Sequence, residues 1–150
     1  MLIPMKVDYG VRMLVFLAQQ PEGAYASTSE IAGTQYVPEP YLLHICADLQ
    51  RAGLIESRRG PQGGHRLARP ADEISVADVV SSLDYSLAPL DCVDEPGDCT
   101  LSGACSQREL WSDVEQLLLN HLSGVRIAEL ASKQRDMNSR RVAPVRTTFA

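Results

Sequence analysis

A helical pattern that runs directly into a glycine-rich hairpin is the feature that most restricts how this chain can fold. Pro40 lies near a first helical turn, apolar residues then recur at helical spacing, and Gly53 follows as a helix-stop residue. Two short extended stretches, Leu54–Arg58 and His65–Ala68, flank a tip that is rich in glycine. The sequence therefore predicts a mainly α-helical fold with a small β-hairpin.

Capping signals and apolar spacing predict the remaining elements. Apolar spacing predicts a helix over residues 7–20. A capping box at 27 predicts a second helix that ends at about 33–35, and another capping signal predicts a helix over 76–83. A long amphipathic helix follows, with apolar residues spaced along one face from 110 to 125. Because this stripe has only modest partners elsewhere in the sequence, it is a candidate dimer seam.

Composition and charge restrict the class of partner. A chain of 150 residues that is 45% hydrophobic and 22% charged suits one ordinary domain with its own core. No apolar run approaches the roughly 18 residues of a membrane span, and Asp8 and Arg12 interrupt what a secretory signal would need, so we expect a soluble, cytoplasmic protein. The net charge is −5, yet residues 50–69 hold five arginines against one acid, Glu56. Such local positive charge attracts a phosphate backbone.

The order of these elements predicts a winged helix-turn-helix. In that motif the second helix enters the major groove of DNA and the hairpin, or wing, lies along the backbone or the minor groove. Arg58 and Arg59 precede the wing tip and Arg66 follows it, while Tyr41 and His44 lie near the start of the second helix. The alternative, from the pattern alone, is a small helical domain whose arginines only solvate the hairpin.

Cys92, Cys99 and Cys105 fall within one short acidic segment that also contains proline and glycine. In a cytoplasmic protein such a group more often binds metal or reacts than forms disulfides. Spacings of six and five intervening residues favour an iron–sulfur cluster over zinc, whose sites use tighter pairs. A zinc site and a metal-free thiol switch remain alternatives. Cys46, at an apolar position of the second helix, is expected to pack in the core.

Several segments resemble the winged-helix iron–sulfur regulators: VDYGVRMLVFLA, SEIA, YLLHICADLQRAGLIESRRGPQGGHRLARP, ISVADVV and the three cysteines before ELW. That family includes the nitric-oxide sensor NsrR, the cluster-biogenesis regulator IscR and the iron regulator RirA. The resemblance extends from about residue 1 to 131. It implies a homodimeric bacterial transcription regulator, a repressor, that binds double-stranded DNA at an inverted-repeat operator. It further implies control by an iron–sulfur cluster, 4Fe-4S or alternatively 2Fe-2S, that senses nitric oxide, redox or iron status.

The expected organisation assigns a winged helix-turn-helix domain to residues 1–84 and a cluster-binding loop to 85–108. A dimerisation helix region over 109–131 and a disordered tail over 132–150 complete the chain. The cluster ligands implied by the resemblance are Cys92, Cys99 and Cys105. The candidate DNA-binding residues are Ser29, Pro40, Tyr41, His44, Arg51, Arg58, Arg59, Gly60, Gly63, Gly64, His65 and Arg66.

Three cysteines leave one iron of such a cluster without a protein ligand. The IscR branch has a histidine three residues after the last cysteine, where this chain has Arg108, which cannot deprotonate and so cannot ligate. The resemblance to NsrR-type members implies instead that Asp8 of the partner subunit is the fourth ligand. The alternative is that Asp8 caps the first helix. Leu43 also replaces a glutamate that the IscR branch uses in base discrimination, so a different operator is expected.

Other functions remain as alternatives. A metal-free winged-helix adaptor would bind protein partners, and a thiol-based redox switch would use the cysteines without metal. An enzyme is not expected, because the chain has no CxxC pair, nucleotide-binding loop or substrate-pocket signature.

Overall fold

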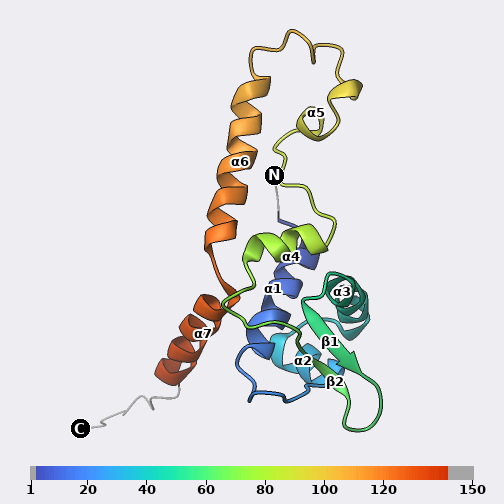
Figure 1. The fold of residues 1–150 in the computed structure, drawn as a ribbon, viewed down its shortest axis with the longest axis vertical. Helices are drawn as coiled ribbons and strands as arrows, with labels where there is room; N and C mark the ends of the chain where they lie inside the picture. Colours follow the sequence, from blue (N-terminus) through green and yellow to red (C-terminus); the bar gives the residue numbers. More distant parts are fainter. Residues whose placement is uncertain (1–2, 142–150) are drawn as a thin grey trace, which may run out of the picture.

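The computed structural model describes residues 3–141 and has two parts, a helical domain that bears the hairpin and a long helix that rises from it (Figure 1). The segment that holds Cys92, Cys99 and Cys105, named the cysteine loop here, lies at the far end of that helix. The elements in chain order are α1 (Met5–Leu17), α2 (Thr28–Gln35), α3 (Glu39–Arg51), β1 (Ile55–Arg58), β2 (Gly64–Leu67), α4 (Val76–Ser82), α5 (Asp91–Asp94), the 3-10 helix η1 (Pro96–Asp98), α6 (Arg108–Gly124) and α7 (Ile127–Arg141). The mainly helical fold with a two-stranded hairpin is as predicted.

The helix-turn-helix consists of α2 and α3. α2 begins after Ser27, whose Oγ accepts a hydrogen bond from the backbone N–H of Glu30 at 3.2 Å. It ends at Tyr36, whose left-handed backbone conformation (φ 54°) turns the chain toward α3. α3 ends at Arg51, and Gly53 follows with φ 69°, which confirms the predicted helix-stop glycine.

The core of the domain forms where α1, α3 and α4 meet at Gly10. A Cβ at this position would lie only 2.8 Å from Leu83 Cδ1 and 3.3 Å from Val79 Cγ1, and 3.8 Å from Ile45 Cγ2. Glycine therefore permits the close approach of these helices. Around this point the interior is made of fully buried aliphatic side chains, which include Met13, Leu14, Ile31, Leu42, Ile45, Leu49 and Ile74.

α4 begins with the predicted capping box. Ser75 Oγ accepts from the Asp78 backbone N–H at 3.1 Å, and Asp78 Oδ2 accepts from the Ser75 backbone N–H at 2.8 Å. The chain returns to this place after α6, since the Ile127 N–H donates to the Ile74 carbonyl at 2.9 Å. The start of α7 is thereby fixed beside the start of α4.

The wing is the antiparallel pair β1 and β2, with Ile55 opposite Leu67 and Arg58 opposite Gly64. Both strands agree with the predicted hairpin to within a single residue at each end. Ile55 is buried in the domain, whereas the rest of β1 is exposed, so the hairpin is anchored at its base and projects from it (Figure 1).

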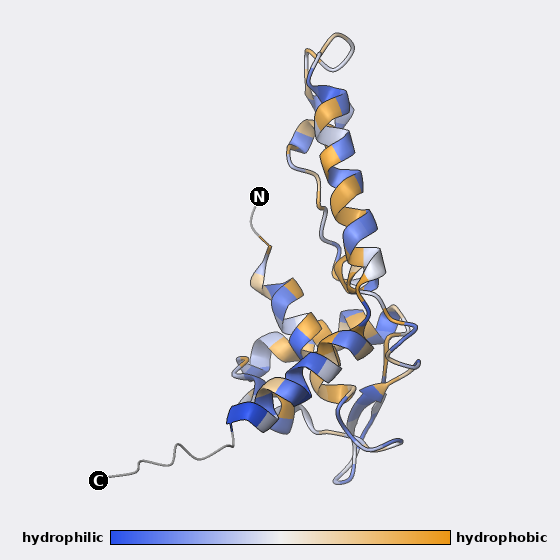
Figure 2. Ribbon diagram, turned by 90° about the vertical axis from the view of Figure 1, so that its left-hand side faces the viewer, coloured by the Kyte–Doolittle hydropathy of each residue, from blue (hydrophilic) through white to orange (hydrophobic). Residues whose placement is uncertain are grey.

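The predicted apolar stripe of α6 lies partly against the core of the domain and partly in solvent. Near the domain, Leu118, Leu119 and Leu122 pack against the core. Leu117, next to Leu118 in the sequence, is 69% exposed, and Leu110, near the start of the helix, is 55% exposed. Figure 2 shows that apolar residues continue along α6 well beyond the domain. The outer part of the helix therefore has an apolar face that this single chain does not cover.

α7 corrects the expected end of the ordered chain. The helix runs to Arg141, so the prediction of a disordered tail is wrong for residues 132–141, and residues 142–150 lie outside the described part of the chain. Ile127 and Ala131 are buried in the same core as α1. Leu130 packs against the same core, and this apolar side stabilises a helix whose residues from 132 to 141 are polar apart from Met137. Among residues 3–141, no helix is long and apolar enough to span a membrane.

Candidate DNA interface and cysteine loop

α3 presents one face outward, as a recognition helix requires. Pro40, Tyr41, Leu43 and His44 are exposed, with Tyr41 and Leu43 each at 56%. Tyr41 meets Tyr9 of α1 edge to face, with 6.1 Å between ring centroids, which restrains the ring at the start of α3. The predicted contacts of the second helix therefore lie together on one accessible surface.

Ser29 and Arg51 lie at the ends of the helix-turn-helix. Ser29 is exposed in the first turn of α2. Arg51 Nη1 lies 3.2 Å from Asp48 Oδ1, and Lys6 Nζ lies 2.7 Å from the other carboxylate oxygen. The hydrogen bond from Lys6, supported by both positive charges, lowers the pKa of Asp48. Asp48 therefore joins the start of α1 to the end of α3.

The wing tip exposes two arginines. Arg58 and Arg59 are exposed at the end of β1, and neither takes part in an ion pair within the described residues. Gly60 follows with φ 107°, and its carbonyl accepts from the Gly63 N–H at 2.9 Å. A Cβ on Gly63 would overlap the backbone of Arg58. The glycines thus keep the tip tight beside two available positive charges.

His65 attaches the wing to the segment before α2. Its N–H donates to the Ala26 carbonyl at 2.8 Å, and its carbonyl accepts from the Ala26 N–H at 3.0 Å. The ring is only 9% exposed, with Nδ1 2.8 Å from Ser57 Oγ and Nε2 3.0 Å from Thr28 Oγ1. Burial lowers the pKa of His65. This position is at odds with the expected DNA contact, because both ring nitrogens are engaged inside the domain.

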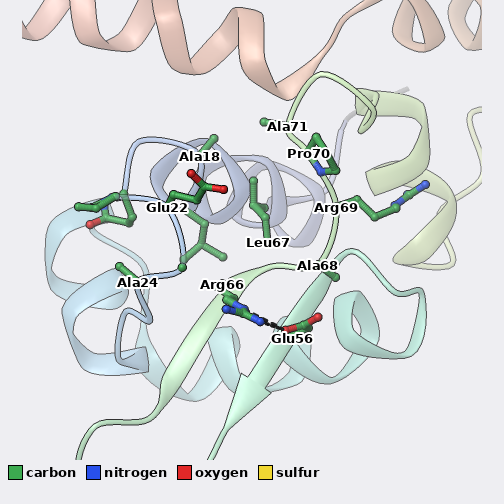
Figure 3. A pocket seen from close by; sticks show the side chains of 14 residues that line it. Ala18, Glu22, Ala24, Glu56, Arg66, Leu67, Ala68, Arg69, Pro70 and Ala71 are labelled. Atoms are coloured by element: carbon green, nitrogen blue, oxygen red, sulfur yellow. Dashed lines mark hydrogen bonds and ion pairs between the residues drawn. The ribbon is translucent and has the colours of Figure 1, made fainter.

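Arg66 is also engaged within the chain. Its Nε and Nη2 donate to Glu56 Oε2 at 2.9 and 2.7 Å, and its guanidinium carbon lies 4.9 Å from the centre of the Tyr25 ring. Figure 3 shows the pair at the edge of a cavity of about 510 Å³ between the end of α1 and the segment after β2. The cavity includes no other predicted site residue. Sequence reasoning missed Tyr25, although an aromatic residue just before a capping serine was visible.

The three clustered cysteines lie on the loop that joins α4 to α6. Cys92 is in α5, Cys99 follows η1, and Cys105 precedes α6; each is a free thiol and half-buried. Arg108, the first residue of α6, donates from Nη1 to the Ser102 carbonyl at 3.2 Å and to Ser102 Oγ at 2.8 Å. Arg108 therefore holds the loop instead of offering a ligand.

The donor set of this loop fits an iron–sulfur cluster in its chemistry. Three free, partly accessible thiols on one segment are the ligands that such clusters take. Within residues 3–141, no three histidine, cysteine or acidic side chains converge as a single metal ion requires.

Asp8 occupies the first turn of α1 without capping it. The N-cap is Pro4, which makes no side-chain cap, so the capping interpretation of Asp8 is wrong. Asp8 Oδ2 is buried and lies 2.7 Å from Arg12 Nη2, but it receives no hydrogen bond of acceptable geometry. A carboxylate oxygen therefore remains incompletely satisfied in the single chain.

Cys46 behaves as predicted for a core residue. It is 5% exposed, and its sulfur lies 3.7 Å from the sulfur of Met13. Burial raises its pKa to about 11, which keeps the thiol protonated and unreactive near neutral pH.

Comparison with known proteins matches this architecture to one family. The sequence profile of the Rrf2 family, described as iron-dependent transcriptional regulators, matches residues 3–133. The chain belongs to the Rrf2 family. Rrf2 members are DNA-binding transcriptional regulators that act as dimers, and they are not enzymes. Three predictions are therefore confirmed: the winged-helix fold, the resemblance to this class of regulator, and a protein that is not an enzyme.

Solved structures of Rrf2 regulators resemble most of the chain. CymR (YrzC), the global cysteine regulator of B. subtilis, is 28% identical with a TM-score of 0.72, over 89% of this chain and 98% of that one. T. potens IscR is 29% identical with a TM-score of 0.70, over 96% and 93%. The oxidized form of Staphylococcus aureus CymR is 29% identical with a TM-score of 0.70, over 87% and 96%. A particular closeness to NsrR stays a prediction.

Proposed function

We propose that this chain is a repressor that binds an inverted-repeat operator as a homodimer, with an iron–sulfur cluster that sets its DNA affinity in response to nitric oxide, redox or iron status. The observation that carries the proposal is the contrast among its cysteines: three are free and accessible on one loop, and the fourth is buried in the helix-turn-helix. The iron dependence of the family and the likeness to IscR support a cluster.

Each winged domain contacts one half of the operator. Tyr41 and His44 of α3 face the base edges in the major groove, and Arg58 and Arg59 meet phosphates or the minor groove. A single winged unit buries too little surface for strong discrimination. The exposed apolar face of α6 supplies the two-fold seam that brings two units together.

Cys92, Cys99 and Cys105 are the proposed thiolate ligands, and the partner's Asp8 is the proposed fourth ligand. A bound cluster supplies iron that exchanges or reacts with small gases, most readily where its donor is a hard carboxylate. Asp8 has a second available partner, Arg12, within its own helix. Asp8 of α1 would thus pair either with the cluster or with Arg12. Because α1 packs against α3, a change from one partner to the other alters the packing that holds the recognition helix α3.

Anaerobic purification with iron and sulfide analysis and a visible spectrum tests the cluster. Cys92→Ala, Cys99→Ala and Cys105→Ala are each expected to remain folded dimers that lose the cluster, because these residues lie outside the core. Cys46→Ala is the matched control and is expected to retain it. If the Cys46→Ala protein loses the cluster while the Cys99→Ala protein retains it, the proposed ligand set is excluded.

Asp8→Ala tests the fourth ligand, with Arg12→Ala as the control that removes the ion pair but leaves the carboxylate. Asp8→Ala is expected to change the cluster spectrum, the rate of reaction with nitric oxide and the DNA affinity. Arg12→Ala is expected to retain the parent spectrum. If Asp8→Ala matches the parent in all three measurements, Asp8 is not a ligand.

A metal-free thiol switch is the second candidate function. It is favoured by the accessible free thiols and by the likeness to CymR, a cysteine regulator whose structure is known in an oxidized form. This candidate predicts no iron or sulfide after anaerobic purification. It also predicts that a mild oxidant changes DNA affinity and that the cysteine variants abolish that response.

A further inference from the structure

One face of the wing gathers three charged side chains. Glu56 lies opposite Arg66 in the hairpin register, and Arg58 lies two residues beyond Glu56 on β1. Side chains of paired residues, and of residues two apart on a strand, point to the same face. Glu56, Arg58 and Arg66 therefore share one face, whereas Ser57 and His65 occupy the other, where the His65 ring lies between Ser57 and Thr28 of α2.

Tyr25 lies over this charged face. Its ring centre is 5.4 Å from Arg58 Cζ and 4.9 Å from Arg66 Cζ, and both distances fall within the range of about 6 Å for cation–π attraction. The next residue, Ala26, exchanges two backbone hydrogen bonds with His65 of β2. These bonds hold Tyr25 beside the strand in the manner of a third strand, so its place does not depend on the arginines.

The two arginines differ in how their charge is balanced. Arg66 donates twice to Glu56, so its charge is compensated inside the hairpin. Arg58 has no ion pair among residues 3–141 and keeps its charge for an external anion. An unrestrained arginine loses rotamer freedom when it binds a phosphate. Stacking of Arg58 on the fixed Tyr25 ring removes part of that rotamer freedom in the free protein, so less is lost when DNA binds.

We propose that Tyr25 is a positioning residue for DNA binding, because its ring holds the Arg58 guanidinium ready for a backbone phosphate. Arg66 and its partner Glu56 occupy the rest of the face. The sequence had suggested Arg66 as a DNA contact, and in this arrangement its charge is compensated by Glu56 instead. The inference rests on the proposed contact between the wing and DNA.

A double-mutant cycle in the full-length protein tests this role, with a duplex selected from a random-sequence pool by the parent protein as the probe. Tyr25→Leu removes the aromatic face, and Tyr25→Phe retains it. An exposed cation–π contact accounts for about a two- to fivefold effect, and the dimer has two wings, so Tyr25→Leu is expected to weaken binding roughly 5- to 25-fold. Tyr25→Phe is expected to stay within about twofold of the parent.

In the Arg58→Ala background, Tyr25→Leu is expected to change affinity by less than about twofold. A role confined to folding predicts equal losses in both backgrounds, and that result overturns the proposal. An unchanged affinity for Tyr25→Leu beside a weakened Arg58→Ala overturns it as well, while the wing contact stands. If Arg58→Ala alone leaves both affinity and salt slope unchanged, the contact between Arg58 and DNA is refuted, and this proposal with it; an unchanged Arg59→Ala as well refutes the wing contact as a whole. Tyr25→Gln in both backgrounds provides the same comparison if Tyr25→Leu does not fold.

Discussion

Replacing Gly64 with alanine tests how far the wing depends on its backbone attachment to the segment before α2. Gly64 has φ 140°, and a Cβ there would overlap the Ala26 carbonyl. A side chain in this backbone region costs about 1–2 kcal/mol. The carbonyl can move away only if the Ala26–His65 hydrogen bonds of 2.8 and 3.0 Å are lost, which adds roughly 1 kcal/mol for each. We expect Gly64→Ala to lower the free energy of unfolding by about 3–4 kcal/mol.

Gly60→Ala is the matched control for this prediction. Gly60 also has a positive φ, 107°, but nothing lies within 4 Å of an added Cβ. Only the conformational cost of about 1–2 kcal/mol applies there. Urea unfolding of both variants is expected to show a difference of about 2 kcal/mol, and thermal unfolding a difference of roughly 4–8 °C.

The two variants also separate stability from DNA binding. Below its unfolding temperature, Gly64→Ala is expected to bind DNA more weakly than Gly60→Ala, because its wing is no longer tied to α2. The reasoning is refuted if both variants have the same unfolding free energy. It is equally refuted if Gly64→Ala retains parent DNA affinity while its stability falls as expected.

Three further predictions concern other parts of the molecule. Cys46→Ala is expected to lower the free energy of unfolding by about 1 kcal/mol, measured by urea unfolding, since it removes a buried sulfur that touches Met13. Burial holds the pKa of His65 below 6.5, so the unfolded chain binds more protons than the folded chain below that pH. The free energy of unfolding is therefore expected to fall as the pH drops through 6.5. In acid titrations of unfolding, His65→Gln is expected to reduce this pH dependence. Leu117→Glu is expected to shift light-scattering mass toward the monomer, whereas Gln116→Glu, also exposed on α6, leaves the dimer intact.

The local elements of the domain could be predicted because their signals lie close together in the sequence. Ser27 and Ser75 are hydrogen-bonded caps, and Gly53 ends α3 in the left-handed region. The glycine-rich tip between two short extended stretches was sufficient to place both strands to within a residue. Each of these features depends on residues no more than a few positions apart, or on a turn whose chemistry is specific.

The features that the sequence could not supply depend on distant contacts. The part of α7 beyond residue 131 was missed because its residues are polar apart from Met137, and the burial of Ile127 and Ala131 against the core supports the helix. His65 was assigned to DNA because it follows the wing tip, yet its partner Thr28 lies 37 residues earlier in the chain. Arg66 was assigned on its charge alone, before Glu56 and Tyr25 were known to face it. Residue type identified these side chains, and only tertiary structure shows which partners they have within the chain; their contact with DNA stays a prediction.

The meeting of helices at Gly10 explains how events in the cysteine loop can reach the recognition helix. Leu83, at the end of α4, and Ile45 of α3 both lie within 4 Å of the position of a Cβ on this glycine. The chain continues from Leu83 through the buried Leu87 to the loop, and Asp8 precedes Gly10 on the same helix. Close-packed helices respond to a displacement by discrete shifts, since the interior has no space in which to absorb it. In the function proposed above, a change in the partners of Asp8 or of the loop cysteines would therefore act on the same contact that fixes α3, without any need for those groups to touch DNA.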